Sequence, residues 1–506
     1  MRHFTFLPFV IAVLCTSSFS LAQVPSFDLT FGGTGLVTTT FGTGADFGAT
    51  VGRQGDGKIV VSGYTHVGAT DVVAVARFHD NGTLDSGFSG DGKATISIVG
   101  GNDYGFGMGL FPDGDIVIGG TAWNGSNQDF SAYRFNSDGS PDIDFSLDGK
   151  VNTGFGAGHD RGYALCVDGT QVLVAGTSHN GVNDDAALLR YNADGSLDNT
   201  FGSGGKVTTA IGGASDGNQD IRAIALQPDG RILIAGSSFN GSNNDVALIR
   251  YNSNGALDDT FGNNGVVITS VGPGDESAAS ILLVGNQILV AGIANNKMLI
   301  LRFDNDGGLD TGFGTNGHVI VDVGTQSGFS AMALCADGDV ILAGRVDMDL
   351  ALVRIDPSGT LDSDFGIDGV FTHSIGSGLD NGRSLAMMPD GRILVTGFTT
   401  TSSNIDLFVA RFIIDASSTS LDSNDGPVDV QVFPNPTSGS FIIRIPEHAG
   451  LFRADITDLT GRIVQMVHST NQECVQVELE HPVGEYLLDL FVGNQRRTVK
   501  LLKRDY

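Results

Sequence analysis

The chain of 506 residues has few charged side chains, and few of those are basic. Asp and Glu number 57 against 28 Lys and Arg, which gives a formal net charge of −29 at pH 7. A surface of this sign repels a phosphate backbone, so the composition excludes general nucleic-acid binding. Tryptophan occurs once, whereas phenylalanine occurs 31 times and glycine 73 times, about twice the usual glycine share. Abundant glycine with few charges indicates many short strands and tight turns, and excludes a protein of long helices.

Hydrophobic runs long enough to span a bilayer, about 20 residues, are also missing from the sequence. A nine-residue apolar run, Phe6 to Leu14, follows a short polar start. Ser20-Leu21-Ala22 then places small residues at the −3 and −1 positions of a cleavage site before Gln23. We therefore expect residues 1–22 to be a secretory signal peptide and the mature protein to be soluble and exported, with no transmembrane segment.

Cysteine is scarce, with three residues after the expected cleavage site: Cys166, Cys335 and Cys474. No C-x-x-C spacing of the kind used for metal binding occurs. Cys166 and Cys335 are expected at equivalent positions of two non-adjacent repeats, too far apart for a disulfide. We interpret both as small buried hydrophobic residues.

The main feature of the sequence is an internal repeat, marked by the phrase L-D-x-x-F-G-x-x-G-x-V. Its seven copies are spaced 52 to 60 residues apart, measured between their phenylalanines. These anchoring residues are Phe31, Phe88, Phe145, Phe201, Phe261, Phe313 and Phe365.

Each repeat contains four runs of strand length. In the fourth copy they are Val207 to Thr209, Arg222 to Gln227, Arg231 to Ala235 and Val246 to Tyr251. Asp-Gly and Asn-Gly pairs between the runs supply the left-handed torsions of tight turns. The later runs are almost continuously apolar, which predicts burial on both faces, as in a sheet stacked between neighbours.

Four antiparallel strands repeated seven times predict an all-β fold, a seven-bladed β-propeller over residues 23–415. A solenoid is the main alternative, but solenoid repeats are usually shorter than about 50 residues. The chain begins with a strand of the outermost type, Leu36 to Thr40, and ends its repeats with three strands, Ser384 to Phe412. We expect the N-terminal strand to complete the last blade, which closes the ring and removes two free edges.

The repeats resemble the delta-60 repeat family of bacterial propeller-like proteins. The matching phrases are Ala225 to Gly236 with Arg250 to Phe261, and Leu385 to Gly397. The fifth unit departs from the family pattern, with Val284-Gly285-Asn286-Gln287 in place of the Pro-Asp-Gly turn. The resemblance covers about residues 27 to 414. It implies a fold, and it assigns no activity to any residue.

A polar linker, residues 416–427, separates the repeats from a second region, residues 428–506. Alternating strand patterns with proline-asparagine and glycine turns predict a small β-sandwich there. The region resembles the type A C-terminal sorting domain of type IX secretion cargo in Bacteroidetes bacteria. That resemblance implies the type IX secretion machinery as a partner, passage across the outer membrane, and attachment to the cell surface or release. The alternative is an ordinary accessory sandwich. The matching motif residues are Pro434, Asn435, Pro436, Gly439, Asp458, Gly461, Arg462, Gly484 and Tyr486.

Motifs that carry chemistry are absent from the mature sequence. Its histidines form no H-E-x-x-H pattern, and no G-x-S-x-G or P-loop motif occurs. The segment Phe303 to Gly308 resembles the start of a calcium-binding loop but lacks the glutamate expected at its twelfth position. We expect no cofactor and no catalytic or metal residue, with calcium at this segment as the alternative.

One position recurs in a way that suggests ligand binding. A ring-bearing side chain stands just after the second strand of four consecutive units, namely His66, Trp123, His179 and Phe239. The loops that follow are expected to be long in these units and short in the fifth and sixth. Rings and amides gathered on one face suit a sugar- or peptide-binding crescent. The alternative is that the rings cap the neighbouring blade.

The sequence therefore favours a secreted or surface-displayed binding platform. The first alternative is a polysaccharide hydrolase or lyase, which rests on analogy between propellers. Such an enzyme needs converging carboxylates, and the expected innermost runs, such as Ile224-Ala225, carry none. The loops still offer acids and bases, among them Asp160, Asp216, Asp220 and Asp380. A structural coat protein is the third reading.

Overall fold

The computed structural model describes residues 25–98, 100–211, 217–402 and 404–414, and then the segments 431–433, 440–444, 451–458, 463–470, 474–479, 481–482, 484–492 and 495–503. The chain divides into two units, Met1–Ala416 and Ser417–Tyr506. None of the described residues is helical, and none forms a helix able to cross a membrane. The expected signal peptide and linker lie outside the described residues.

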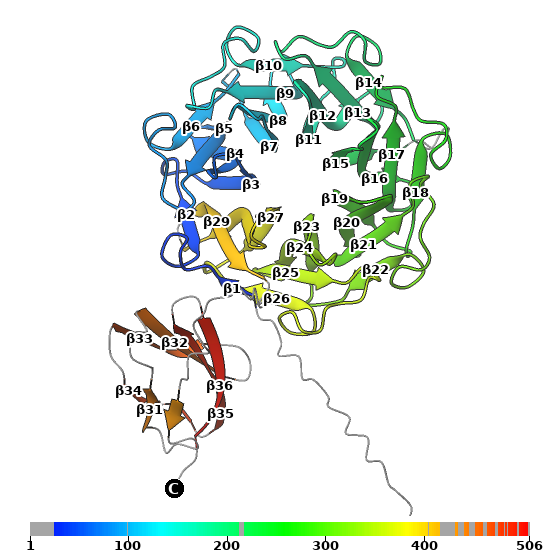
Figure 1. The fold of residues 1–506 in the computed structure, drawn as a ribbon. Helices are drawn as coiled ribbons and strands as arrows, with labels where there is room; N and C mark the ends of the chain where they lie inside the picture. The colour runs from blue at the N-terminus through cyan, green and yellow to red at the C-terminus, as the bar shows by residue number, and fades with distance from the viewer. Residues whose placement is uncertain are drawn as a thin grey trace, which may run out of the picture. The chain divides into compact units, whose positions relative to one another are not determined.

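The first unit is a ring of seven sheets (Figure 1). Six sheets have four strands in sequence order, and in each the first strand lies nearest the centre of the ring. This arrangement confirms the predicted propeller and the predicted innermost strand. Blade 1 contains β3 (Asp46–Arg53), β4 (Ile59–Val67), β5 (Thr70–Phe78) and β6 (Lys93–Ile96); blade 2 contains β7 (Asp103–Leu110), β8 (Ile116–Trp123), β9 (Gln128–Phe135) and β10 (Lys150–Thr153); and blade 3 contains β11 (Asp160–Asp168), β12 (Gln171–His179), β13 (Asp184–Tyr191) and β14 (Lys206–Thr209). Blade 4 contains β15 (Gln219–Leu226), β16 (Ile232–Phe239), β17 (Asn244–Tyr251) and β18 (Val266–Thr269); blade 5 contains β19 (Glu276–Val284), β20 (Gln287–Ala294), β21 (Lys297–Phe303) and β22 (His318–Val321); and blade 6 contains β23 (Ser327–Leu334), β24 (Val340–Val346), β25 (Asp349–Ile355) and β26 (Val370–His373). Blade 7 contains β27 (Asp380–Met387), β28 (Ile393–Thr400) and β29 (Ile405–Ile413), together with β2 (Leu36–Thr39) and β1 (Ser26–Phe27) from the N-terminal end.

Burial within a blade follows the apolar pattern of its strands. The second and third strands are buried along almost their whole length because neighbouring blades cover both of their faces. Innermost strands such as β7 alternate between buried and partly exposed residues instead. The core is therefore a series of clusters between blades. One of them joins Leu173 and Leu188 of blade 3 to Ile234 and Ile249 of blade 4.

The repeated phrase builds a contact between consecutive blades, which we call the inter-blade clamp. In blade 4 the clamp consists of Arg250, Asp258 and Phe261. Arg250 Nε lies 2.7 Å from Asp258 Oδ2, and its guanidinium carbon stands 4.3 Å from the centre of the Phe261 ring. Arg250 Nη1 also donates to the carbonyl of Asn305, which belongs to a turn of blade 5. The clamp thus ties a buried cation of one blade to the backbone of the next.

The anchoring phenylalanines are 0 to 1% exposed in all seven copies. In each of the first six copies, a glycine from the turn after the third strand of the next blade lies against the anchoring phenylalanine. Gly255 has φ +84°, and a Cβ there would lie 3.0 Å from both the Phe201 ring and the amide nitrogen of Gly202. The Gly202 N–H in turn donates to the carbonyl of Asn254 at 2.8 Å. A glycine is therefore needed at this turn for its torsion and for the close approach of the two blades.

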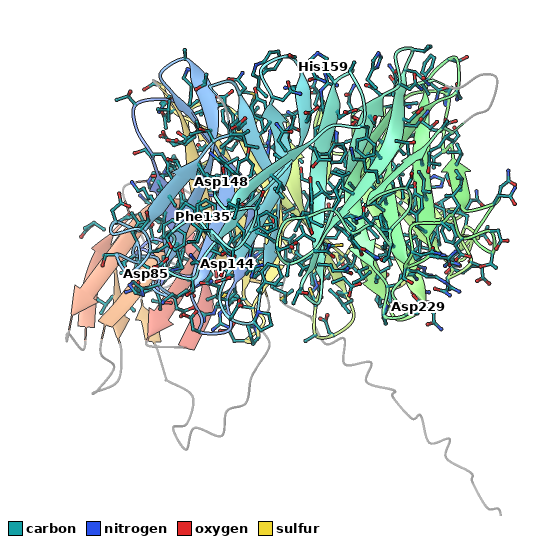
Figure 2. The ribbon with its side chains drawn as sticks, turned by 90° about the horizontal axis from the view of Figure 1, so that it is seen from above. Asp85, Phe135, Asp144, Asp148, His159 and Asp229 are labelled. Carbon is teal, nitrogen blue, oxygen red and sulfur yellow. The ribbon has the colours of Figure 1, made fainter. Side chains whose placement is uncertain are left out.

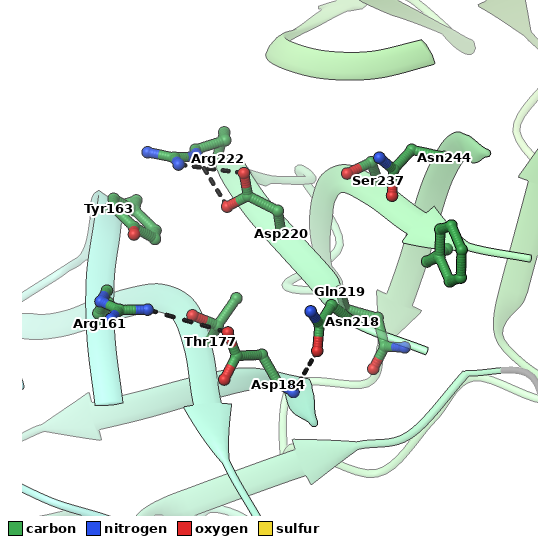
Figure 3. Close-up of a pocket in the computed structure, with 11 residues that line it drawn as sticks. Arg161, Tyr163, Thr177, Asp184, Asn218, Gln219, Asp220, Arg222, Ser237 and Asn244 are labelled. Carbon is green, nitrogen blue, oxygen red and sulfur yellow. Dashed lines mark hydrogen bonds and ion pairs between the residues drawn. The ribbon is translucent and has the colours of Figure 1, made fainter. Parts of the chain in front are cut away.

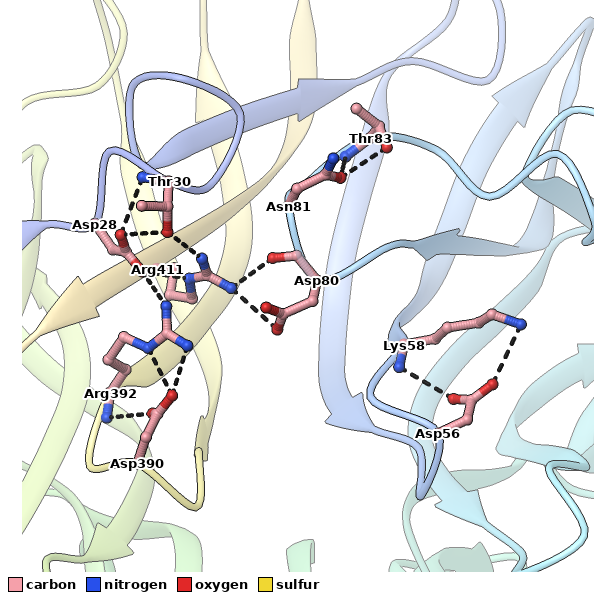
Figure 4. A network of polar contacts seen from close by, with 10 residues as sticks. All are labelled: Asp28, Thr30, Asp56, Lys58, Asp80, Asn81, Thr83, Asp390, Arg392 and Arg411. Atoms are coloured by element: carbon pink, nitrogen blue, oxygen red, sulfur yellow. Dashed lines mark hydrogen bonds and ion pairs between the residues drawn. The ribbon is translucent and has the colours of Figure 1, made fainter.

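The two ends of the propeller sequence share blade 7. Strand β2 pairs with β29 through Leu36–Ala410 and Thr39–Leu407, which confirms the predicted closure. Strand β1, which the sequence did not indicate, pairs with the same strand through Phe27–Phe412. Figure 4 shows the clamp that joins them: the Arg411 guanidinium reaches Asp28 on the N-terminal segment and Asp80 in blade 1.

The cysteine prediction needs one correction. The register places Ala164 of blade 3 level with Ala331 of blade 6, so Cys166 corresponds to Ala333 and Cys335 stands two residues further on. The shift arises because blade 3 closes this hairpin with a two-residue turn and blade 6 with a longer one. Both side chains pack against apolar clusters as expected, and burial raises the pKa of the Cys166 thiol to about 12.

The second unit consists of two antiparallel sheets. One contains β30 (Gln431–Phe433), β31 (Ser440–Arg444) and β34 (Cys474–Glu478), and the other contains β32 (Leu451–Asp458), β33 (Ile463–Thr470), β35 (Gly484–Val492) and β36 (Gln495–Lys503). Residues from both sheets form one buried cluster that includes Phe441, Ile456 and Leu488. This is the arrangement of a small β-sandwich.

Candidate functional site

The two faces of the propeller differ in the loops they carry. Figure 2 shows His159 on one face and the turns with Asp85, Asp144 and Asp229 on the other. His159 immediately precedes the innermost strand β11, so its face is the one at which innermost strands begin. We call this the upper face. It carries the connections that lead into each innermost strand and the turns between second and third strands.

The four ring-bearing residues lie at one position of the repeat on the upper face. Each stands at or near the end of the second strand, and its cross-strand partners are Asp71 for His66, Gln128 for Trp123, Asp184 for His179 and Asn244 for Phe239. The turns after them differ from the prediction in one unit. Blade 1 continues its hairpin to Val67 and Thr70, so its turn has only two residues, as in blades 5 and 6. Blades 2, 3, 4 and 7 have longer turns of four residues.

Three of these rings lie close to the connection that leads into the innermost strand of their own blade. A Cβ on Gly101, in the connection that leads into β7, would lie 2.4 Å from Cγ of Trp123. Gly158 and Gly217 stand in the same relation to His179 and Phe239. The connection therefore passes directly beneath each ring, which leaves the outer part of the ring toward solvent. Phe239 is 38% exposed.

Carboxylates do stand on the innermost strands, contrary to the sequence interpretation. The strands begin three or four residues earlier than the predicted runs that start at Arg222 and Ser384, and their first residues include Asp46, Asp103, Asp160, Glu276 and Asp380. These side chains are 0 to 1% exposed. Their oxygens accept backbone N–H groups of the preceding connection: Asp103 accepts from Ile98 at 2.6 Å and Asp160 from Phe155 at 2.6 Å. They hold the connection in place.

A pocket of about 450 Å³ opens between blades 3 and 4 on the upper face (Figure 3). Blade 3 contributes Arg161, Tyr163 and Asp184, and blade 4 contributes Asp220 and Arg222. Phe239, Asn218, Gln219, Thr177, Ser237 and Asn244 complete the lining. The pocket thus combines two aromatic rings with several convergent polar groups.

Charges in the pocket are paired. Arg222 Nε lies 2.8 Å from Asp220 Oδ1, and its guanidinium carbon lies 3.8 Å from the centre of the Tyr163 ring. Arg161 Nη1 lies 3.8 Å from Asp184 Oδ2. The other oxygen of Asp184 lies 2.8 Å from Nδ1 of His179. Of the predicted residues, Phe239 therefore lines the pocket and His179 adjoins it through Asp184, whereas His66 and Trp123 are not part of its lining.

The repeat explains why the pocket opens at this junction. The second-strand residue opposite the second residue of the innermost strand is Tyr64 in blade 1 and Phe398 in blade 7. At the same register position, blade 3 has Thr177 and blade 4 has Ser237. Both short side chains line the pocket. These short side chains leave open the space that Tyr64 and Phe398 occupy in blades 1 and 7.

The four loop acids proposed from the sequence lie in different surroundings. Asp160 and Asp380 are buried, and Asp380 accepts hydrogen bonds from Ile375 N–H and the Thr399 hydroxyl at 2.6 Å each. Asp220 lines the pocket. Asp216 lies outside the described residues. The sequence interpretation missed Arg161, Tyr163 and Arg222, because alternation along the innermost strands is the only signal they give, and it missed Asp184 at the start of the third strand β13.

The segment considered for calcium forms a turn. Asp304 Oδ1 accepts the N–H groups of Asp306 at 2.9 Å and Gly308 at 2.8 Å, as in an Asx turn. Within the described part of the chain, no group of three or more His, Cys, Asp or Glu side chains is arranged to hold a metal ion.

In the second unit, two predicted sorting-motif residues are described with their side chains. Gly484 begins β35, and Tyr486 is buried, with its hydroxyl donating to the carbonyl of Pro482 at 2.7 Å. Asp458 ends β32. The remaining motif residues, Pro434, Asn435, Pro436, Gly439, Gly461 and Arg462, lie outside the described residues.

The fold and the repeated clamp define an all-β repeat propeller joined to a small β-sandwich. Six segments of the propeller match the family described as the domain of unknown function DUF5122 beta-propeller, which resembles the delta-60 repeats, and they are followed by a secretion system C-terminal sorting domain of the type IX kind. The propeller family matches residues 54–88, 112–145, 171–201, 227–261, 286–313 and 335–365, and the sorting domain matches residues 431–504. The protein is thus exported to the cell surface or the medium by engagement with the type IX secretion machinery.

Comparison with solved structures gives only distant likenesses, and no curated protein matches the chain. Sqt1 from Chaetomium thermophilum is 11% identical over 70% of this chain and 80% of its own, with a TM-score of 0.37. Prolyl oligopeptidase B from Galerina marginata is 11% identical over 79% of this chain and 55% of its own, with a TM-score of 0.39. The polysaccharide lyase Uly1 is 8% identical over 73% of this chain and 78% of its own, with a TM-score of 0.34. Likenesses at this level carry no functional information.

Proposed function

We propose that the propeller is a non-enzymatic binding platform and that its ligand occupies the pocket between blades 3 and 4. The observation that carries this proposal is the convergence of Tyr163, Phe239 and two ion pairs on a cavity of about 450 Å³. That volume lies within the range of about 300–1,000 Å³ found for ligand sites, which typically combine rings with a few placed polar groups.

The polar groups of the pocket suit recognition better than proton transfer. Asp184 and Asp220 each face an arginine, and Asp184 also contacts His179. A hydrolase or lyase needs a carboxylic acid free to give or take a proton at the scissile bond. Paired carboxylates and guanidinium groups instead present fixed acceptors and donors to the hydroxyl or amide groups of a ligand.

The four ring-bearing residues of the upper face remain part of this proposal. Phe239 contacts the ligand in the pocket, and His179 orients Asp184 at its edge. Trp123 and His66 extend the same face over blades 2 and 1, where their outward parts offer flat contact surfaces for a ligand longer than the pocket.

The test is a screen of the purified full chain against arrays of glycans and peptides. It is repeated with the double variant Arg161→Ala and Asp220→Ala. Ser277→Ala is the matched control because Ser277 occupies the position of Asp220 in blade 5. We expect a ligand whose binding weakens at least tenfold in the double variant and is unchanged in the control.

Two results would contradict the proposal. Cleavage of a bound polysaccharide, abolished by Asp220→Ala, would establish the hydrolase or lyase instead. A blank screen of correctly folded protein would favour a structural coat.

A further inference from the structure

A row of aromatic side chains leads from the pocket along the inner side of the ring. We call it the aromatic arc; it consists of Phe398 of blade 7, Phe47 and Tyr64 of blade 1, Tyr104 and Phe106 of blade 2, and Tyr163 of blade 3. Successive ring centres along this order lie 5.2, 4.7, 5.0, 5.9 and 5.5 Å apart. The contacts are therefore continuous across four consecutive blades.

An arginine stands at each end of the arc. The guanidinium carbon of Arg383 lies 5.1 Å from the centre of the Phe398 ring. At the other end, Arg222 lies 3.8 Å from the centre of the Tyr163 ring, and both residues line the pocket (Figure 3). The arc and the pocket thus form one surface, with its deepest part between blades 3 and 4.

The arc is accessible from the centre of the ring. Phe47 and Tyr104 are the second residues of β3 and β7, and Phe106 and Tyr163 are the fourth residues of β7 and β11. These innermost strands surround the centre of the propeller in Figure 1. All four side chains and that of Tyr64 are partly exposed, whereas Phe398 is buried and supports the Phe47 ring from behind.

The repeat itself shows that the fold does not need these rings. Blade 5 has Ser277 and Ala279 at the same two strand positions, and blade 6 has Gly328 and Ser330. Both blades nevertheless form complete four-stranded sheets with the same bulge in the innermost strand. Aromatic residues confined to one half of a symmetric ring therefore point to a ligand and not to packing of the blades.

The charges and side chains of this surface indicate which class of ligand it can bind. The arginines of the pocket are balanced by Asp220 and Asp184, so the pocket offers hydrogen bonds without a net positive charge. The chain carries a formal net charge of −29, which repels a polyanion. Partly exposed rings give flat apolar contacts, and tyrosine adds a hydroxyl at the edge.

We propose that the arc and the pocket bind one neutral oligosaccharide, whose sugar rings lie along the arc with one end of the chain in the pocket. This inference rests on the proposed function and names its ligand class. The aromatic rings contact the apolar faces of the sugars, and the paired arginines and aspartates exchange hydrogen bonds with the sugar hydroxyls. The ligand follows the curvature of the ring from blade 3 toward blade 7.

The test measures binding of the full chain to cellohexaose, laminarihexaose and mannohexaose by calorimetry, with a galacturonate hexamer as the anionic probe. The arc is removed with Tyr104→Ala and Phe106→Ala together. A stacked ring contributes about 0.5–1.5 kcal/mol, so losing two should weaken binding about 5- to 150-fold. Tyr104→Phe with Tyr163→Phe keeps every ring and should retain binding within about threefold.

Two further variants locate the effect. Ser277→Ala with Ser330→Ala changes the equivalent strand positions of blades 5 and 6 and should leave binding unchanged. Trp123→Ala with His179→Ala removes the outer rings of the upper face, and a smaller loss there than in the arc variant supports the arc. Thermal unfolding of each variant confirms that it is folded, and Tyr104→Ala alone provides the test if the double alanine variant is not.

The outcomes separate the two proposals. Neutral hexasaccharide binding that is lost in the arc variant supports the inference. Tighter binding of the galacturonate hexamer, or neutral binding unaffected by loss of the arc, overturns it. If the pocket variants weaken a peptide or another ligand while the arc variant does not, the arc inference fails and the binding platform stands. If nothing binds to folded protein, both fail.

Discussion

Arg411 in β29 and Asp28 beside β1 form an ion pair, with Nε 2.8 Å from Oδ2, although the whole ring lies between them in the sequence. Both side chains are almost fully buried. The same guanidinium group reaches the Phe31 ring and the carbonyl of Asp80 in blade 1 (Figure 4). The closure of the ring thus has an inter-blade clamp like those of the interior repeats, and the two ends of the propeller sequence supply its residues.

The closing clamp should be among the costliest polar contacts to break. Asp28→Ala leaves the Arg411 guanidinium buried without this partner, and loss of one partner of a buried ion pair typically costs about 3–5 kcal/mol. We expect the free energy of unfolding in urea to fall by that amount. Asp229→Ala removes the exposed partner of Arg231 and should cost at most about 1 kcal/mol. Equal losses in the two variants would contradict the role of Asp28.

The glycine under the anchoring phenylalanine should tolerate no side chain. Gly255 and Gly241 have positive φ angles of +84° and +101°, but a Cβ on Gly255 would collide with Phe201 and Gly202, whereas one on Gly241 meets open space. Gly241→Ala measures the torsional cost alone, about 1–2 kcal/mol. Gly255→Ala should lower the free energy of unfolding by clearly more. Similar values for both would show that the blades can separate without penalty.

Replacing one buried carboxylate should stabilise the protein. Burial raises the pKa of Asp46 by more than hydrogen bonds from the Thr65 side chain and the Phe41 N–H lower it, and the negative charge of Asp406 raises the pKa further. When the pKa of a carboxyl group is raised on folding, its ionisation destabilises the folded state at higher pH. Protonation removes this destabilisation as the pH falls. Asp46→Asn should therefore raise Tm at pH 7, with a gain that shrinks as the pH falls. Blade 4 already has an amide, Gln219, at this position. A lower Tm at pH 7 would contradict this expectation.

A clamp carboxylate should show the opposite pH dependence. The Thr200 hydroxyl and N–H and the Arg190 guanidinium outweigh burial and lower the pKa of Asp198 to about 2. This carboxylate stabilises the fold above the unfolded pKa of about 4, and the contribution is lost as the pH falls toward 2. Asp198→Asn should lower Tm at pH 7, and the difference from the unaltered chain should disappear between pH 4 and pH 2. A difference independent of pH would exclude an electrostatic origin.

Export should depend on the second unit. Deletion of residues 431–504 removes the matched sorting domain. We expect the deleted chain to remain inside the outer membrane, whereas the full chain reaches the surface or the medium; cell fractionation with a propeller antibody distinguishes them. Tyr486→Phe loses one buried hydrogen bond, about 1 kcal/mol, and should still be exported. Export of the deleted chain would contradict the assignment.

The fold was predictable because each repeat contains the short-range sequence features that specify a blade. An anchoring phenylalanine, a glycine that needs positive φ and apolar runs of strand length recur together, so errors in one copy are corrected by the others. Strand β1 escaped prediction because two residues, Ser26 and Phe27, have no periodicity. The short turn of blade 1 escaped because Val67 continues a hairpin that Gly68 and Ala69 close.

The candidate site was less predictable because the ring brings together residues distant in the sequence. Phe398 and Phe47 belong to opposite ends of the propeller, and their contact exists only once the ring is closed. The sequence pattern places the acids that begin the innermost strands in loops, because strand ends carry little sequence signal. Phe239 was found because it repeats a position, whereas Arg222 and Tyr163 are individual departures from the repeat.

The sharing of blade 7 by the two ends of the sequence also sets an order of events. Strands β1 and β2 are the first strands of the propeller to be synthesised and their partner β29 is the last, so β1 and β2 have no sheet to join until the other strands of blade 7 exist. Contacts of such long sequence separation slow folding. Six blades can form from local segments of the chain, whereas the ring closes into one cooperative unit only when β29 pairs with β1 and β2.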